Sequence, residues 1–546
     1  ILIFNSINMK KINTIFTSAI IGLAVFTSSC VNDLNVQPLD PTQITASKAY
    51  TDSLSYAEGL NKIYSVWALS GQDGAGASDI SGLDPGNTVL LRSWWTLQEQ
   101  TTDECKNAWP DSWCAEINGQ TWGTEKVEPI EGVYQRCMFI VALTNEFLRN
   151  ISNAPSNVNI PKYKAEARFN RALAYYVLMD MFGRPPFITE TNYSSTPSQL
   201  SRANLFKWIE SELTSIRPDL PKPRTTYGRA DQAADDALLA RMYLNAKVYT
   251  GTERYTDCIS ACNRIINDGA YSLATNYADL FKADNGENAD TRQEIIYPIM
   301  FDGNKTQSYG MAAIILGSRS ASDYSVVPSG INSGWDGFRS TQNLINLFDF
   351  KSGVDKANNT ILDKRGIFYS KGRNLNITTS VKGTFTTEGW SVYKWTNITS
   401  KGANGSNLGF PDTDFPLFRL GDVYLMYAEA VARGGQGGDI NTAVKYVNML
   451  RERGYGDKDH DIDAAWLTAN NFRNILNERG RELYWEGVRR TDLIRFGLFT
   501  SSSYVWPDKG GVITGVGIDN KYDLFPIPQT DLSVNGNLSQ NEGYTN

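Results

Sequence analysis

Apolar residues recur at intervals of three and four along much of this chain, the spacing that lines one face of an α-helix. The stretches with this period are 47–70, 127–149, 161–182, 201–217, 230–249, 255–267, 417–433, 440–453 and 470–495. They predict a mostly α-helical fold.

Three of the predicted helices combine small residues with tyrosines. Small residues let neighbouring helices approach closely while aromatic rings fill the remaining volume, as in tetratricopeptide hairpins. The pairs are Ala167 with Tyr175, Ala237 with Tyr243, and Ala428 with Tyr424. We therefore expect tetratricopeptide-like helix pairs as the scaffold.

Two stretches, 72–122 and 283–409, lack a helical period. Both are rich in Gly, Ser, Asn, Asp and Trp, which predicts long loops or short strands laid on the helical frame. Loops of that length usually carry function. The chain accordingly divides into an N-terminal helical region, 47–282, and a C-terminal region, 283–546.

Charge and composition exclude several functions. The net charge is −7 and the sequence pI is about 5.2, whereas nucleic-acid binding needs a Lys/Arg surface that releases counterions. The 546 residues include a single histidine, His460, although imidazole is the usual general base and the commonest metal ligand. Nucleic-acid partners, histidine-based triads and histidine-based zinc sites are therefore not expected.

The N-terminus has the layout of a secretory leader over residues 9–29. Two lysines follow Met9, an apolar run covers 12–26, and small residues lead to Cys30. The apolar run is too short for a stable membrane-spanning helix. Residues 1–8 precede the first methionine, so we interpret them as upstream reading frame.

The position of Cys30 resembles the bacterial lipoprotein pattern. That resemblance implies cleavage before Cys30, its lipidation, and a tether over 30–46. Thr27 stands where the pattern usually has an aliphatic residue. The alternative is a spare cysteine near an ordinary cleavage site.

The remaining cysteines would lie in an oxidising compartment, where disulfides persist. Cys105 and Cys114 are close enough in sequence to close a small loop, and we predict a bridge between them. Cys258 and Cys262 fall one helical turn apart, a poor disulfide geometry. With Cys137 they are interpreted as small core residues.

Long segments in both halves of the chain resemble the SusD/RagB family. The N-terminal segments are EARFNRALAYY at 166–176 and MFGRPPF at 181–187. The C-terminal segments are DTDFPLFRL at 412–420, ERGRELYWEGVRRTDLIRF at 478–496, FPIP at 525–528 and QNEGY at 540–544. The match is especially close to the family's starch-binding member at 102–105, 283–288 and 302–310.

The resemblance implies a mostly helical SusD-like fold without enzymatic activity. It also implies a lipoprotein at the outer membrane, facing the cell exterior, that covers a SusC-like TonB-dependent transporter barrel and hands it oligosaccharide. The helices would support the protein, and the inserted loops would contact the ligand.

A sugar-binding site needs flat aromatic faces for C–H groups and polar side chains for hydroxyls. By register with the starch-binding member, Trp109 and Tyr309 match its aromatic arc, and Asp84 and Arg92 match polar groups that bind sugar hydroxyls. Trp335 matches a looser surface contact.

Two further residues are secondary candidates. Asn107 falls where the arc has another aromatic residue, and Trp113 could supply the missing face. Ser112 stands where an amide is expected.

Structural interpretations of these residues remain open. Trp94, Trp95 and Trp122 are expected to anchor the first loop to the core, since buried tryptophan is commoner than ligand-binding tryptophan. Asp84 and Arg92 could instead form a surface ion pair of little energetic consequence.

Oxygen side chains cluster at Asn288 with Asp290 and at Asp412 with Asp414, and hard calcium prefers such groups. The starch-binding member has a similar calcium loop, in which an acid would serve better than the Gly286 found here. The alternative is an Asn/Asp-rich turn that satisfies its own backbone. Apart from this structural calcium, no cofactor is expected.

The arginines of 473–495 interleave with glutamates at helical spacing. This pattern predicts a structural ion-pair network and not an anion site.

Three functions compete at this point. The leading hypothesis is non-catalytic capture of starch-like α-glucan or a related oligosaccharide. A glycoside hydrolase would need a pair of carboxylates, and no motif supports one. The third is a scaffold that mainly gates the transporter or binds peptide, as some RagB-like members are thought to do.

Overall fold

The computed structural model describes residues 49–321, 327–351, 361–379 and 387–545. The predicted leader, Cys30 and most of the tether lie outside these residues. Within them, no helix is long and apolar enough to cross a bilayer.

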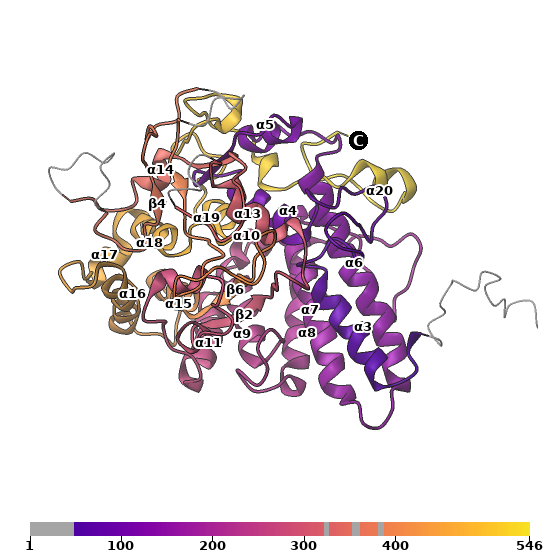
Figure 1. Cartoon of the computed structure of the whole chain (residues 1–546). Coiled ribbons are helices and arrows are strands. Elements are labelled where there is room, and N and C mark those ends of the chain that lie inside the picture. The colour runs from indigo at the N-terminus through magenta and orange to yellow at the C-terminus, as the bar shows by residue number, and fades with distance from the viewer. Residues whose placement is uncertain (1–48, 322–326, 352–360, 380–386, 546) are drawn as a thin grey trace, which may run out of the picture.

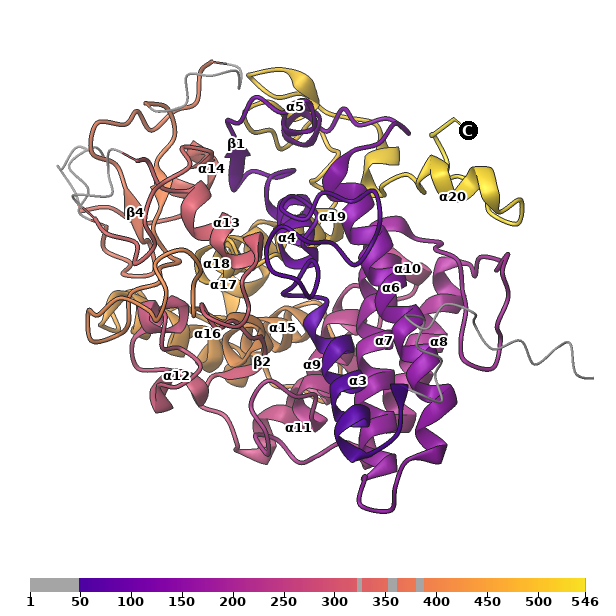
Figure 2. The ribbon, with the colours of Figure 1, turned by 45° about the vertical axis from the view of Figure 1, so that its right-hand side comes forward.

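The long helices form two groups on opposite sides of the molecule (Figures 1 and 2). The N-terminal group contains α3 (Ser53–Ser65), α6 (Glu128–Asn150), α7 (Ile160–Phe182) and α8 (Arg202–Ile216). The C-terminal group contains α15 (Leu420–Ala432), α16 (Ile440–Tyr455) and α18 (Arg473–Leu483), with the short α17 (Ala464–Thr468) beside them. Between them lie α9 (Gln232–Leu244), α10 (Ala246–Thr250) and α11 (Tyr255–Asp268).

Shorter elements occupy the predicted loop regions and the C-terminus. The helices are α4 (Leu90–Glu99), α5 (Ser112–Gly119), α12 (Ala289–Arg292), α13 (Tyr309–Gly317), α14 (Gln342–Ile345), α19 (Arg489–Arg495) and α20 (Gln529–Val534). The strands form antiparallel pairs: β1 (Cys105–Asn107) with β3 (Phe338–Ser340), β2 (Ile295–Ile299) with β6 (Phe415–Arg419), and β4 (Phe368–Tyr369) with β5 (Ser391–Val392).

The mostly helical fold is confirmed, and several predicted helices end within a few residues of their expected limits. Others differ. The first is shorter than 47–70, and the stretch 230–249 is divided at Asn245 into α9 and α10. The stretch 417–433 begins as strand β6. The last helix is broken between α18 and α19, where Trp485 and Gly487 have positive φ angles of 62° and 76°.

Helices α4 and α13 lie where loops were predicted. All ten residues of α4 are buried, and α13 is apolar along most of its length. Because α13 is apolar on nearly every side, its sequence shows no amphipathic period. The ten-residue α4 contains both apolar and polar residues, and it buries Arg92, Gln98 and Glu99 together with its apolar side chains.

The predicted helix pairs are adjacent in space: α7 packs on α8, α9 on α11, and α15 on α16. Tyr424 of α15 stacks on Tyr446 of α16, with ring centroids 4.3 Å apart. The tetratricopeptide-like detail of these pairs stays a prediction.

The predicted Cys105–Cys114 disulfide is wrong. Cys105 lies in β1 and Cys114 in α5, and both are buried free thiols. Burial raises the pKa of each thiol, which disfavours the reactive thiolate. Cys137, Cys258 and Cys262 are also buried and unbridged, as expected.

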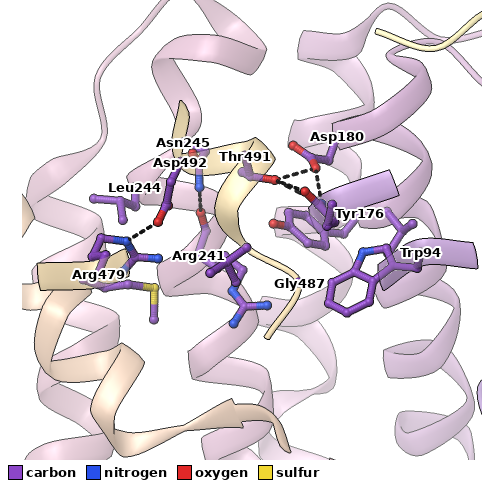
Figure 3. Close-up of a pocket in the computed structure, with 14 residues that line it drawn as sticks. Trp94, Tyr176, Asp180, Arg241, Leu244, Asn245, Arg479, Gly487, Thr491 and Asp492 are labelled. Carbon is purple, nitrogen blue, oxygen red and sulfur yellow. Dashed lines mark hydrogen bonds and ion pairs between the residues drawn. The ribbon is translucent and has the colours of Figure 1, made fainter. Parts of the chain in front are cut away.

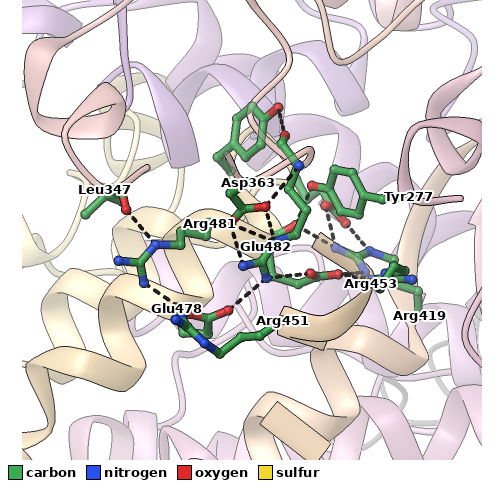
Figure 4. A network of polar contacts seen from close by, with 12 residues as sticks. Tyr277, Leu347, Asp363, Arg419, Arg451, Arg453, Glu478, Arg481 and Glu482 are labelled. Carbon is green, nitrogen blue, oxygen red and sulfur yellow. Dashed lines mark hydrogen bonds and ion pairs between the residues drawn. The ribbon is translucent and has the colours of Figure 1, made fainter. Parts of the chain in front are cut away.

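A network of buried ion pairs joins the C-terminal helices to the strands (Figure 4). Arg419, at the end of β6, contacts Glu294 at 2.9 Å, Glu482 at 2.6 Å and Glu486 at 2.7 Å. Arg365 contacts Asp363 at 2.7 Å as well as Glu478 and Glu482. The structural ion-pair network predicted for 473–495 is therefore confirmed.

A second buried charge feature lies at the C-terminal end of α4. The Glu99 carboxylate accepts a hydrogen bond from the Gly487 N–H at 2.6 Å, and that of Glu104 accepts one from the Trp485 N–H at 3.1 Å. Burial is the main cause that raises the pKa of both acids, that of Glu104 to about 7. The neighbouring Glu104 raises the pKa of Glu99 further, whereas hydrogen bonding with Glu99 lowers that of Glu104. These two acids hold the break between α18 and α19 against α4.

Replacing Arg419 by methionine should lower the free energy of unfolding by about 3–5 kcal/mol, because it leaves buried carboxylates without their cation. Urea denaturation followed by circular dichroism measures this change. Lys247→Met is the control, since Lys247 and Glu253 form an ion pair that is 62% and 50% exposed, and it should leave stability unchanged. Equal stability of the two variants would contradict a structural role for the network.

Glu104→Gln should alter the pH dependence of stability. Because the pKa of Glu104 is raised from 4.5 to about 7 in the folded state, protonation of this carboxyl stabilises the fold. This contribution to the free energy of unfolding is fully present below pH 4.5 and is lost as the pH rises to 7. The wild type should therefore lose stability relative to the variant by up to about 1.4 kcal/mol per pH unit between pH 4.5 and pH 7, and the difference should level off above pH 7. Urea unfolding of both proteins from pH 5 to pH 8.5 checks this; parallel curves would contradict the buried-acid assignment.

Candidate functional site

The β1–β3 ladder brings the two predicted loop regions together. Its register pairs Cys105 with Ser340 and Asn107 with Phe338. Directly beyond the ladder, the Trp109 indole N–H donates a hydrogen bond to the Trp335 carbonyl at 2.9 Å. The two rings lie 6.1 Å apart at an interplanar angle of 55°.

A glycine permits this arrangement. A Cβ atom at Gly337 would lie 2.5 Å from the Trp109 ring, so any side chain there would displace the indole. The close approach of ring to backbone therefore depends on Gly337.

Tyr309 continues the row of rings. It is the first residue of α13, whose N-cap Ser308 accepts a hydrogen bond from the Gly310 N–H. Its ring centroid lies 6.1 Å from that of Trp335 at an interplanar angle of 50°. Trp109, Trp335 and Tyr309 are each partly exposed, and together we call them the aromatic platform.

Arg92 lies beside the aromatic platform without a carboxylate partner. Its side chain projects from α4, is 7% exposed, and places the guanidinium carbon 5.4 Å from the Trp109 ring centroid. Burial is the main cause that lowers its pKa to about 10. In the described residues no ion pair or hydrogen bond occupies the guanidinium, so its donors are available to a ligand.

Asp84 lies next to Arg92 but does not form the alternative ion pair with it in the described structure. Its carboxylate accepts backbone N–H bonds from Gly86 at 2.9 Å and Asn87 at 2.6 Å. A Cβ atom at Gly86 would be within 3.8 Å of Asp84, Arg92 and Tyr309, so these three side chains surround one point. Asp84, Arg92 and Tyr309, which were predicted from the sequence, therefore lie close together around Gly86.

The secondary candidates are buried. Asn107 is fully enclosed, and its carboxamide oxygen accepts the Trp109 backbone N–H at 3.0 Å. Trp113 is 6% exposed on α5. The hydrogen bond from the Trp109 N–H to Asn107 thus positions Trp109. Ser112 is exposed at the start of α5.

The remaining tryptophans of the first loop anchor it to the core, as expected. Trp94 and Trp95 lie on α4, and the Trp95 indole donates to the Trp485 carbonyl at 3.1 Å. The Trp122 indole donates to the Tyr544 hydroxyl at 2.9 Å.

Sequence reasoning missed Phe410, whose ring lies 5.8 Å from that of Tyr309. The signal that could have revealed Phe410 is that it is an isolated aromatic residue after the Gly-, Asn- and Ser-rich stretch 402–409.

The oxygen clusters predicted to bind calcium are occupied by the protein's own donors. Asn288 caps α12, and the Asp290 carboxylate accepts hydrogen bonds from Thr275. The Asp412 carboxylate bonds to Gly303 and Ser406, and that of Asp414 to Phe301 and the Tyr227 hydroxyl. No group of three or more His, Cys, Asp or Glu side chains is placed to bind a metal within the described ranges, so calcium stays a prediction.

An enclosed cavity between α4, α7, α9 and the residues after α18 is not a ligand site (Figure 3). It is lined by Trp94, Tyr176, Asp180, Arg241, Arg479 and Thr491, among others. Its volume of about 20 Å³ is enough for one water molecule. The aromatic platform, which carries the residues predicted from the sequence, is the candidate site.

Partly exposed rings beside a guanidinium on a helical frame indicate a carbohydrate-binding protein. Comparison with known proteins gives its family. Residues 293–544 match the SusD family, and residues 88–244 match a family described as "Starch-binding associating with outer membrane". The chain is 34% identical to the starch-binding protein SusD of Bacteroides thetaiotaomicron, over 98% of this chain and 99% of that one. It belongs to the SusD/RagB family.

Solved structures show the same fold. A SusD-like carbohydrate-binding protein of Bacteroides fragilis superposes with a TM-score of 0.69 at 19% identity, over 89% of this chain and 99% of that one. The surface glycan-binding protein A of Bacteroides thetaiotaomicron, in complex with laminarihexaose, gives 0.65 at 20% identity, over 90% and 100%.

Arg92→Met should leave the free energy of unfolding unchanged or raise it by up to about 1 kcal/mol. The reason is that it removes a largely buried charge that has no opposite partner in the described structure. Urea denaturation measures this, and Arg419→Met is the matched control in which the same exchange breaks a paired arginine. A loss for Arg92→Met as large as that for Arg419→Met would show that Arg92 is structural.

Proposed function

We propose that this protein captures starch-like α-glucan oligosaccharides on the aromatic platform, without cleaving them, and delivers them to a SusC-like TonB-dependent transporter. Lipidated Cys30 would hold it at the outer membrane, facing the cell exterior. A structural calcium near Asp412 and Asp414 belongs to the same proposal.

The observation that carries the proposal is the open guanidinium of Arg92 above a row of partly exposed rings. Aromatic faces stack on the C–H faces of sugar rings, and guanidinium, carboxylate and amide groups bind the hydroxyls around them. A buried arginine without an acidic partner costs stability, so its retention favours a ligand role.

The preference for α-glucan is supported by the 34% identity to starch-binding SusD over nearly the whole of both chains. A different glycan, or a peptide, is the alternative within the same type of uptake system. The fold shared with a laminarihexaose-binding protein makes β-glucan the first alternative to test.

Trp109→Ala should weaken glycan binding by about 2 kcal/mol or more, since it removes the ring that lies against both Arg92 and Trp335. Affinity electrophoresis in gels with starch, pullulan, dextran, β-glucan, xylan or levan measures this, followed by titration calorimetry on the retarding glycan. Tyr193→Ala is the control, because Tyr193 is 73% exposed and outside the aromatic platform.

Each result has a distinct meaning. Retardation by starch or pullulan alone, lost in Trp109→Ala and kept in Tyr193→Ala, supports α-glucan capture. Retardation by another glycan keeps the receptor role and changes the ligand. Release of reducing ends from any glycan would contradict non-catalytic capture, and absence of retardation in every gel would favour peptide.

A further inference from the structure

We infer that Phe410 is a fourth ring of the aromatic platform and gives the protein its preference for longer oligosaccharides. This inference rests on the proposed function and adds a residue to the same site. Phe410 lies on the segment 404–412, which precedes β6.

The first argument is spacing. The rings of Trp109, Trp335, Tyr309 and Phe410 follow one another with centroid distances of 6.1, 6.1 and 5.8 Å. The corresponding interplanar angles are 55°, 50° and 56°. Phe410 therefore continues the row at the same step and tilt, and its ring is partly exposed like the others.

The second argument is that the segment carrying Phe410 is held in place. The Asp412 carboxylate accepts the Gly303 N–H and the Ser406 hydroxyl, both at 2.7 Å, while the Asp412 N–H donates to the Asn397 carboxamide at 2.8 Å. The Leu408 carbonyl accepts the Asn332 N–H at 2.8 Å. A ring on a fixed segment needs less ordering on binding than a ring on a free loop.

Gly303 permits the close approach of this segment. A Cβ atom there would lie 2.5 Å from the Phe410 carbonyl oxygen and 2.9 Å from Asn407. The absence of a side chain at Gly303 therefore fixes where the Phe410 ring lies.

Hydroxyl-binding groups accompany the ring. The exposed Asn304 amide donates to the Ser406 hydroxyl at 3.0 Å, and Asn407 lies on the same segment. An aromatic face beside exposed amides and a hydroxyl matches one sugar unit, with its C–H face on the ring and its hydroxyls at the rim.

This arrangement predicts an effect of chain length. A short oligosaccharide can be held by Arg92 and the aromatic platform without Phe410, whereas a longer chain also reaches Phe410. Losing one stacking contact should weaken binding of the long ligand roughly three- to tenfold and leave the short one within about twofold.

Titration calorimetry with maltotriose and maltoheptaose tests this on wild type and Phe410→Ala. Phe410→Trp should restore the affinity for maltoheptaose. Leu408→Ala is the control, because Leu408 is an apolar residue that is 40% exposed on the same segment and carries no aromatic ring. Gly303→Ala is an independent variant that keeps the ring but shifts it, and it should reproduce the selective loss.

An unchanged affinity of Phe410→Ala for maltoheptaose, or an equal loss for both ligands, would overturn the inference while the proposed function stands. Failure of the wild type to bind either ligand would instead overturn the α-glucan proposal.

Discussion

The site depends on the three-residue ladder between β1 and β3. Two segments more than 200 residues apart in the chain pair there, and this pairing brings Trp109 close to Trp335. A ladder this short is not stable by itself. It persists because Asn107 and Asn118 exchange hydrogen bonds at 3.0 and 2.7 Å, and because the buried Lys106 ammonium donates to the Asn118 carbonyl at 3.0 Å.

Buried arginines serve two different purposes in this fold. Arg419 lies among three carboxylates, so its charge is compensated and it joins strands to helices. Arg92, which is 7% exposed, has the Trp109 ring beside its guanidinium and forms no ion pair within the described residues. The helix that carries Arg92 is itself held at its far end by Glu99 against the break after α18. The fold therefore holds one largely buried arginine without an ion pair next to the aromatic platform.

The sequence predicted helices with one apolar face, as in α6, α11 and α16. It failed for α13, which is apolar along most of its length, and for the ten-residue α4, whose polar residues are buried together with its apolar ones. Trp485 and Gly487 break the last helix through backbone angles that no periodicity reveals. The Cys105–Cys114 prediction relied on sequence distance, whereas the strand and helix that hold these residues keep them as separate thiols.

Resemblance to the family located Trp109, Tyr309, Trp335, Arg92 and Asp84, which the structure brings together. Asn107 looked like a gap in the arc, and the structure makes it the residue that positions Trp109. Phe410 was missed because its neighbour in the row, Tyr309, is about 100 residues earlier in the chain. The strand pairs and the hydrogen bonds of Asp412 bring these distant loops together. Local sequence patterns do not reveal such contacts.

The tilt between successive rings restricts the ligand. Neighbouring rings are inclined by 50° to 56°, so a flat, ribbon-like glycan can lie face-on against one ring but not against the next. A chain that curves, as an α-1,4-linked or β-1,3-linked glucan does, can present successive sugar faces to successive rings if it turns in the same sense. Stacking energy requires face contact, so the geometry favours curved over straight glycans. The ring geometry therefore fits α-1,4-linked and β-1,3-linked glucans alike, and the similarity to starch-binding SusD is what favours the proposed α-glucan ligand.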